Sequence, residues 1–276
     1  MGRRAISRGR LAAYIVLAFL SVVFLVPVYV MLVTSFKSLA EIQTSSIWSI
    51  PKAFTLEAFR IAGSRMFRGV INSVLMTVPA TVISCIIGSI NGYCLSKWKF
   101  KGSDLLFTLV LFGMFIPYQS VLIPLVVFLQ KIHLYDSLAG LVLVHVIYGV
   151  PITTLIFRNY YATVPNELIE AGRIDGAGLL GIYRHILLPI SLPAFAVVAI
   201  WQFTNIWNEF LFAVTLIATP DKQPVTVALQ NLSGSMISQW NVQMAGALIA
   251  SAPTLVVYVL LGRYFIGGLM AGALKG

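Results

Sequence analysis

The stretch LAAYIVLAFLSVVFLVPVYVMLVTS occupies residues 11–35 and carries no charged side chain. As a helix with a rise of about 1.5 Å per residue, it is long enough to cross the roughly 30 Å hydrocarbon core of a bilayer. Its apolar residues are continuous rather than alternating, which excludes a strand of a membrane β-barrel. The run also exceeds the apolar core of a cleaved signal peptide, about 7–15 residues, so we expect an uncleaved first span.

Five more apolar runs follow, and with the first they predict six transmembrane helices. They cover residues 70–96, 105–129, 137–157, 187–217 and 244–265. Of the 276 residues, 59% are hydrophobic and only 10% are charged, too few to give a soluble protein of this size a polar surface. We therefore expect an all-α polytopic membrane protein whose transmembrane domain, 11–265, lies between an N-terminal segment, 1–10, and a tail, 266–276. Within the third run, Pro117 predicts a kink.

The net charge of +10 comes from basic clusters between the apolar runs rather than from one basic stripe, so it does not indicate nucleic-acid binding. With the N-terminus inside, the inner segments hold most of the basic residues, which predicts that both termini are cytoplasmic. These residues are Arg3, Arg4, Arg8, Arg10, Lys97, Lys99, Lys101, Arg158, Arg173, Arg184, Arg263 and Lys275. The outer segment 36–69 is also basic and weakens this bias, and we expect it to fold as short amphipathic pieces.

The connector between the fourth and fifth runs, residues 158–186, is long for a link between neighbouring helices. Pro165 stands where a helix can begin, and Ile169 and Gly172 follow at helical spacing. Gly176 would end or turn that helix. A short exposed helix stopped by glycine suits docking onto another protein, and the residues taken alone indicate no more than a docking element.

The same connector contains a specific spacing of residues. Glu170-Ala171-Gly172 is followed after three residues by Gly176, and after nine more by Ile186-Leu187-Leu188-Pro189. This spacing resembles the EAA loop of ABC importer permeases. Gly172 departs from the second alanine of that pattern. The alternative for this segment is an ordinary amphipathic helix at the membrane surface.

The resemblance extends over essentially the whole chain and is narrower than the loop alone. Asp175-Gly176-Ala177, Pro193 and the closing segment 268–276 are similar to the carbohydrate branch, the maltose-type second permease subunit. Segments 201–210 and 224–232 look closest to permeases of glucose or mannose importers. The substrate implied is a monosaccharide such as glucose or mannose, or a small oligosaccharide.

The resemblance implies the ABC type I importer permease fold and a heteromeric complex in a bacterial or archaeal cytoplasmic membrane. This chain would form half of the translocation pathway beside a second permease subunit, two ATPase subunits and an extracytoplasmic sugar-binding protein. The outer segment 218–243 would approach that binding protein, with a solvated connection as the alternative. The residues implied to contact the ATPase or to shape that contact are Glu170, Ala171, Gly172, Asp175, Gly176, Ala177, Ile186, Leu188 and Pro189.

No enzymatic activity or cofactor is expected on this chain. It has no Gly-Lys dipeptide and so cannot form the phosphate-binding loop, which leaves ATP and Mg to the partner ATPase subunits. Cys85 and Cys94 fall within one predicted span and offer neither a disulfide framework nor a metal site.

Polar residues in the fifth run mark candidate positions on a substrate pathway, because polar groups at membrane depth are costly unless they face a cavity, water or each other. Aromatic rings and amide or carboxylate acceptors also suit the apolar faces and polar rims of a sugar. The candidates are Trp201, Gln202, Asn205, Asn208 and Glu209, with Tyr118 from the third run. Polar packing between helices is an equally weighted alternative.

A stand-alone secondary transporter or channel for a small solute is the alternative function. Such proteins usually need acidic residues within the membrane to couple ions, and only Glu209 is a plausible one here.

Overall fold

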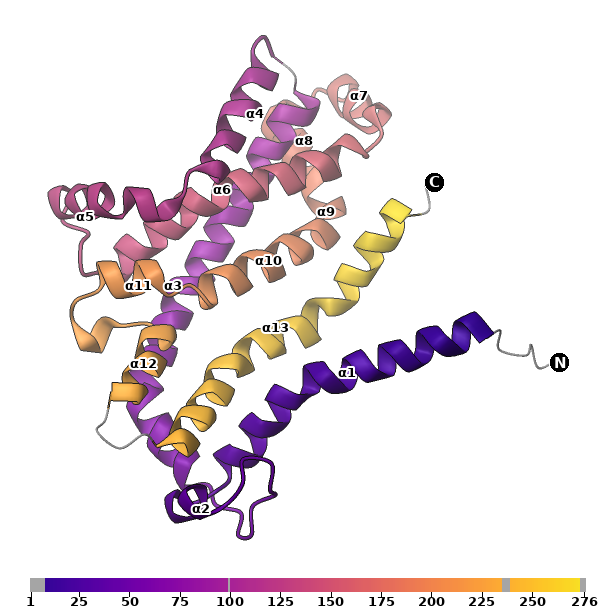
Figure 1. The fold of residues 1–276 in the computed structure, drawn as a ribbon. Helices are drawn as coiled ribbons and strands as arrows, with labels where there is room; N and C mark the ends of the chain where they lie inside the picture. Colours follow the sequence, from indigo (N-terminus) through magenta and orange to yellow (C-terminus); the bar gives the residue numbers. More distant parts are fainter. Residues whose placement is uncertain (1–7, 99, 235–238, 274–276) are drawn as a thin grey trace. The chain divides into compact units, whose positions relative to one another are not determined.

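The computed structural model describes residues 8–98, 100–234 and 239–273, and within these ranges it is helical, without strands (Figure 1). The chain divides into two compact units. The smaller unit comprises Met1–Met66 and Leu229–Ser251, and the larger unit comprises Phe67–Ala228 and Ala252–Gly276. Two long helices, α3 and α13, each contribute to both units.

Four of the described helices contain stretches long and apolar enough to cross a membrane singly: α1 (Arg8–Ser35), α3 (Glu57–Lys97), α6 (Leu138–Ala162) and α13 (Trp240–Ala273). Two bent pairs supply two further candidates. The first joins α4 (Ser103–Phe112) and η1 (Gly113–Phe115) to η2 (Tyr118–Val121) and α5 (Leu122–Lys131) at 87°. The second joins α8 (Leu179–Ile182), the π-helical η3 (Tyr183–Leu187) and α9 (Leu188–Ile190) to α10 (Leu192–Trp207) at 78°. With each pair counted as one span, the described residues contain six spans, as expected.

The first bend lies at the predicted proline. Ile116 and Pro117 separate the two 3₁₀ segments, and both have extended backbone angles. Proline lacks an N–H and biases the residue before it away from helix. The third run is therefore two helical pieces that change direction at Pro117 rather than one kinked helix.

Segment 36–69 was predicted to form only short pieces, and this is wrong for its second half. The short helix α2 (Leu39–Thr44) fits the expectation, but α3 begins at Glu57, well before the predicted start at residue 70. Ala58, Ala62 and Met66 are fully buried at a spacing of four residues, so these polar-looking first turns of α3 pack one face inside the smaller unit. The mean hydropathy of a segment does not reveal that one face of its helix is apolar and buried.

Other predicted boundaries also shift. The fifth span begins at Leu179 and its helix ends at Trp207, whereas 187–217 was expected as one run. Beyond Trp207 a separate short helix, α11 (Leu211–Leu216), starts in the larger unit. Helix α6 continues to Ala162, beyond 157, and α13 continues through Ala273, so the tail expected at 266–276 is helical as far as it is described. The remaining elements are α7 (Asn166–Ile174), η4 (Pro220–Lys222), α12 (Val225–Asn231) and η5 (Leu232–Gly234).

Helices α3 and α6 approach each other closely along a seam of small residues in the larger unit. A methyl group on Gly88 would lie 2.2 Å from Thr153 Oγ1, and one on Gly92 would lie 2.7 Å from the backbone nitrogen of Arg158. Thr153 Oγ1 donates a hydrogen bond to Ser84 O at 3.1 Å across the same seam. Small residues allow such contact between membrane helices.

In the smaller unit, the buried ammonium of Lys37 organises the segment after α1. Lys37 is 2% exposed, and its Nζ donates to Ser46 O at 2.7 Å and to Ser49 Oγ at 3.0 Å. The side chain of Asn241 in α13 donates to the Lys37 carbonyl at 3.1 Å. The two bonds from the ammonium compensate part of the cost of burying a charge and hold the loop after α2 in place, and the bond from Asn241 joins Lys37 to α13.

Candidate functional site

Helix α7 lies in the connector between α6 and α8, and its limits follow from the local sequence. Pro165 has an extended backbone and precedes the first helical residue. At the other end, Gly176 has φ +82°, and the N–H of Ala177 donates to Gly172 O at 2.9 Å. A left-handed residue, usually glycine, is the common way to close the last turn of a helix. Helix α7 is therefore short, with a sharp reversal directly after Asp175.

The two faces of α7 have opposite surroundings. Ile169 and Gly172 are buried, whereas Glu167, Glu170 and Ala171 are exposed. Ile174 is 86% exposed, although it is a large apolar residue. The exposed face of α7 is therefore polar apart from a few apolar side chains such as Ile174.

Gly172 allows α7 to sit directly on the turn that leads into α10. A methyl group at Gly172 would lie 2.7 Å from Ile186 Cδ1 and 3.3 Å from Ile182 Cγ1. The two parts of the loop motif, Glu170-Ala171-Gly172 and Ile186-Leu187-Leu188-Pro189, are thus packed together at this point. Gly172 belongs to the inner face of α7, and the missing methyl group permits close packing.

The other motif residues divide in the same way. Asp175, Gly176 and Pro189 are exposed, and Ala177, Ile186 and Leu188 are half-buried. The structure therefore places Glu170, Ala171, Asp175 and Gly176 where a partner can reach them. Gly172 and Ile186 support them from within.

The C-terminal end of α3 holds α7 near both of its ends. Lys97 Nζ donates to Val164 O at 2.6 Å and to Asn166 Oδ1 at 2.7 Å, beside the start of α7. Near its end, the Arg173 guanidinium carbon lies 4.5 Å from the centre of the Trp98 ring, a cation–π contact. A cavity of about 380 Å³ lies between these elements, lined by Ser96, Lys97, Asn166, Ile169, Glu170 and Arg173.

Three of the six candidate pathway residues lie on one exposed side of α10 and of its C-cap residue, Asn208. Trp201, Asn205 and Asn208 are exposed at spacings of four and three residues, which places them on the same side of the helix. The amide nitrogens of Asn205 and Asn208 donate to the carbonyls one turn earlier, Trp201 O and Thr204 O, at 2.8 and 2.9 Å. An exposed polar stripe on a membrane helix must meet water, a solute or a partner rather than lipid.

The other three candidates have different surroundings. Gln202 is 3% exposed and packs against Gly149, with its amide nitrogen 3.4 Å from Ser84 Oγ and 3.5 Å from His145 O. Glu209 is half-buried, and its carboxylate accepts hydrogen bonds from the N–H groups of Phe212 and Ala213 at 2.8 and 3.2 Å. The carboxylate thus starts α11, as a helix N-cap does.

Tyr118 is 40% exposed, and its ring centre lies 5.4 Å from that of Phe212. Tyr118 therefore lies beside Phe212, whose N–H donates a hydrogen bond to the Glu209 carboxylate.

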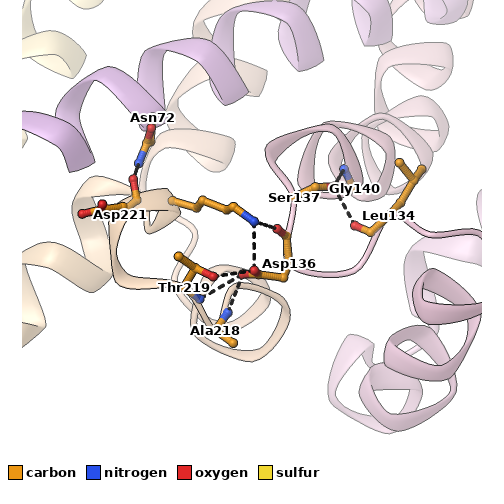
Figure 2. A network of polar contacts seen from close by, with 9 residues as sticks. Asn72, Leu134, Asp136, Ser137, Gly140, Ala218, Thr219 and Asp221 are labelled. Carbon is orange, nitrogen blue, oxygen red and sulfur yellow. Dashed lines mark hydrogen bonds and ion pairs between the residues drawn. The ribbon is translucent and has the colours of Figure 1, made fainter.

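Sequence reasoning missed a polar cluster at the far end of α6, centred on Asp136 (Figure 2). Asp136 Oδ1 accepts from the N–H groups of Ala218 and Thr219 at 3.0 and 2.9 Å, and Oδ2 accepts from Thr219 Oγ1 at 2.6 Å. Lys222 Nζ lies 3.0 Å from Oδ2 and also donates to the Asp136 carbonyl. Residues 218–222 belong to the loop between α11 and α12. Asn72 of α3 also binds this loop, by donating to Asp221 O at 2.9 Å. In the sequence, the pair Asp136-Ser137 before an apolar run indicates a turn. It does not indicate that Asp136 binds residues 218–222, which are about 80 positions away in the sequence.

We expect Asp136→Asn to destabilise this loop in a pH-dependent way. Hydrogen bonds from the Thr219 hydroxyl and N–H, and then from Lys222, hold the pKa of the Asp136 carboxyl well below its usual range. A carboxyl with a lowered folded-state pKa stabilises the fold above its unfolded pKa, about 3.9, and loses that contribution as the pH falls toward the folded value. At pH 7 the variant should therefore melt several degrees below wild type, with a difference that shrinks below about pH 4.

The matched control for that change is Asp221→Asn. It removes a carboxylate from the loop between α11 and α12, to which Asp136 binds, but only the backbone carbonyl of Asp221 takes part in the described hydrogen bonds. Thermal unfolding in detergent between pH 3 and pH 8 measures both variants. Equal melting temperatures for the two variants at pH 7 would contradict the assignment.

Ile174 is a further exposed residue of α7 that the sequence analysis did not single out. The available signal was an isoleucine on the polar face of a short amphipathic helix, one turn beyond Glu170. Among the described residues, no group of three His, Cys, Asp or Glu side chains is placed to hold a metal ion.

Comparisons with known proteins bear on this geometry. The profile of the family described as the binding-protein-dependent transport system inner membrane component matches residues 80–269. A probable ABC transporter permease protein of Pyrococcus horikoshii is 44% identical over 99% of this chain and 100% of its own length. The xylose/arabinose import permease protein XacI of Haloferax volcanii is 37% identical, covering 96% and 93%. The glucose import system permease protein GlcU of Saccharolobus solfataricus is 33% identical, covering 94% and 92%.

A solved structure shares the fold. A chain of a bacterial ABC transporter involved in the import of the acidic polysaccharide alginate matches with a TM-score of 0.82. The match covers 95% of this chain and 100% of that chain at 22% sequence identity.

Proposed function

This chain belongs to the family of binding-protein-dependent transport system inner membrane components, and from that premise we propose that it is one permease subunit of an ATP-driven sugar importer. The shared fold is that of an ABC importer permease, as the sequence predicted. The chain is membrane-embedded and is a transporter component rather than an enzyme. Family membership also argues against a stand-alone secondary transporter or channel.

The exposed face of α7 carries this proposal. On one side of α7, Ile169 and Gly172 are buried against the rest of the larger unit, which makes α7 a rigid projection. On the other side, Glu170, Ala171 and Ile174 are exposed and available to a partner. The partner is an ATPase subunit, which would hold ATP and Mg. Closure of two such ATPase subunits would carry α7 with them and tilt the attached spans, so that the pathway opens to the other side of the membrane.

The remaining partners follow from the same assignment. A second permease subunit would complete the pathway, and a sugar-binding protein would deliver the substrate on the opposite side from α7. In this orientation α7 and both termini face the cytoplasm. The loop held by Asp136 and Asn72 then faces outward, where a preformed surface suits the approach of the binding protein.

The substrate class is a monosaccharide or a small oligosaccharide. Relatives named for xylose/arabinose and for glucose import support sugars in general, and glucose or mannose stays one choice among them. The exposed stripe of Trp201, Asn205 and Asn208 is the proposed contact with the sugar on this subunit, since it offers an aromatic face beside two amides. Buried Gln202 and the capping residue Glu209 would shape that stripe from behind.

Co-purification tests the assignment directly. A tagged chain, expressed with the neighbouring genes of its own genome, should bring down a second permease and an ATPase. In liposomes the complex should take up sugar only when ATP and the binding protein are present. Recovery of an active lone chain that needs no ATP would overturn the proposal.

We expect Ile174→Asp to weaken the contact with the ATPase by about tenfold or more. Covering a bare isoleucine with a partner stabilises the complex by roughly 1.5–3 kcal/mol, and a carboxylate in the same place forfeits that gain. The recovery of the ATPase with the tagged variant measures the effect. Ile50→Asp is the control, because Ile50 is an exposed isoleucine (64%) in the segment before α3. Equal recovery with both variants would exclude Ile174 from the contact.

A further inference from the structure

Four hydroxyl groups meet beneath α7 in an otherwise apolar part of the larger unit. Ser89 Oγ and Tyr161 Oη lie 2.7 Å apart, Tyr183 Oη donates to Ser89 Oγ at 3.0 Å, and Ser191 Oγ donates to Tyr161 Oη at 3.1 Å. Ser89, Tyr161 and Ser191 are fully buried, and Tyr183 is half-buried. We call these four residues the hydroxyl cluster.

The hydroxyl cluster joins four separate elements. Ser89 belongs to α3, Tyr161 to α6 and Tyr183 to η3, and Ser191 is the residue at the bend between α9 and α10. The surrounding side chains are apolar and include Phe157, Ile182, Leu187 and Val198. In such low-dielectric surroundings a satisfied hydrogen-bond network is strong and directional, whereas apolar packing alone is less specific about geometry.

Helix α7 rests on the element that carries Tyr183. Its Gly172 lies against Ile186 of η3 and against Ile182, the residue before η3. A π-helical turn is rare and occurs frequently at functional sites, because its extra residue alters the direction of the side chains that follow. Tyr183 also stacks on Tyr93 of α3, with ring centres 5.9 Å apart and planes at 20°. A continuous series of contacts therefore runs from α7 through η3 into α3, α6 and α10.

We propose that the hydroxyl cluster is the joint through which displacement of α7 reaches the spans, with Tyr161 and Tyr183 as positioning residues. This inference rests on the proposed function, because it names the residues that link the ATPase contact to the pathway. Without the joint, α7 still binds the ATPase through its free face. The spans, however, follow its movement less completely.

The test separates coupling from stability. Tyr161→Phe removes one oxygen and two hydrogen bonds of the hydroxyl cluster while the ring stays in place. In reconstituted complex with binding protein, the number of sugar molecules imported per ATP hydrolysed should fall about fivefold to tenfold, as two buried hydrogen bonds permit. The rate of ATP hydrolysis and the recovery of the ATPase should stay near wild type. A purely structural role would lower stability and leave this ratio unchanged.

Further variants keep the proposal falsifiable. Tyr183→Phe removes one bond and should lower the ratio less, which provides a second reading if Tyr161→Phe purifies poorly. Adding Ser89→Ala to Tyr161→Phe should lower the ratio only by about as much as Tyr183→Phe does, because the bond between Ser89 and Tyr161 is already absent and only the bond from Tyr183 to Ser89 is newly lost. Tyr148→Phe is the matched control on α6, since its hydroxyl makes no described hydrogen bond, and it should keep the wild-type ratio.

Two results separate the proposals. A wild-type ratio in both Tyr161→Phe and Tyr183→Phe, or an equal loss in Tyr148→Phe, would overturn the joint while leaving the importer assignment intact. Absence of any ATPase from the wild-type complex would overturn the proposed function, and the joint would fall with it.

Discussion

Replacing Glu170 with lysine is expected to reduce ATP-driven sugar uptake to background. Glu170 is exposed on the free face of α7 and also lines the cavity beside Lys97 and Arg173, so a third positive charge would be added to a basic corner. Mismatching a charge in a desolvated contact between proteins costs roughly 2–5 kcal/mol, which corresponds to a loss of binding of more than about tenfold. Either the ATPase no longer co-purifies, or it hydrolyses ATP without driving uptake.

The comparison for Glu170→Lys is Glu57→Lys. Glu57 is exposed in the first turn of α3, and the same change there reverses a charge at a distance in sequence from the loop motif. Uptake of radiolabelled sugar into proteoliposomes, together with ATP hydrolysis in the same preparation, measures both variants. Unchanged uptake by Glu170→Lys would remove α7 as the ATPase contact.

Replacing Gly92 with alanine is expected to produce the largest loss of stability of any single methyl group discussed above. Its Cβ would lie 2.7 Å from the backbone nitrogen of Arg158 and 2.9 Å from the backbone carbon of Phe157. Backbone atoms cannot rotate away, so α3 and α6 would have to separate. We expect a loss of about 1–3 kcal/mol, or a melting temperature lower by about 3–10 °C.

Separation at Gly92 would also disturb a neighbouring anchor. The Arg158 side chain donates to Leu95 O at 3.4 Å, pairs with Asp104 at 3.1 Å and lies 4.0 Å above the Phe107 ring, which joins α3, α6 and α4. Because this pair is partly exposed, its own contribution to stability is small. It nevertheless fixes where the three helix ends lie.

The control for Gly92→Ala is Gly262→Ala in α13. An added methyl group at Gly262 meets no atom within 4 Å, and alanine favours helix by up to about 1 kcal/mol over glycine. Thermal unfolding followed in detergent should therefore separate the two variants in opposite directions. A melting temperature for Gly92→Ala equal to that of wild type would show that α3 and α6 are not in close contact at this seam.

The bounds of the loop helix were readable from the sequence, but the face that each of its residues occupies was not. The spacing from Glu170 to Pro189 placed the loop, and Pro165 and Gly176 indicated where its helix begins and ends. The same residues did not reveal that Gly172 faces inward onto Ile186, or that the Ile174 side chain is exposed. A motif gives the order and spacing of residues along the chain. Which of them are buried depends on what packs against the helix in the folded protein.

The pathway candidates show the same limit. Hydropathy singled out Gln202, Asn205, Asn208 and Glu209 because each is polar within an apolar run. Only the fold separates the exposed asparagines from buried Gln202 and from Glu209, whose carboxylate caps α11. Polarity at membrane depth demands a partner, but the sequence does not specify whether that partner is a solute or the backbone of the same chain.

By itself, the sequence determined that this protein is helical and lies in a membrane, because unbroken apolar runs leave the backbone no other way to satisfy its hydrogen bonds. It also determined where the loop motif lies. The tertiary structure decided where the spans begin, bend and end, because those limits depend on packing and capping between residues far apart in the chain. The hydroxyl cluster and the bonds around Asp136 belong to this second group, since each joins residues that only folding brings within a hydrogen bond's length.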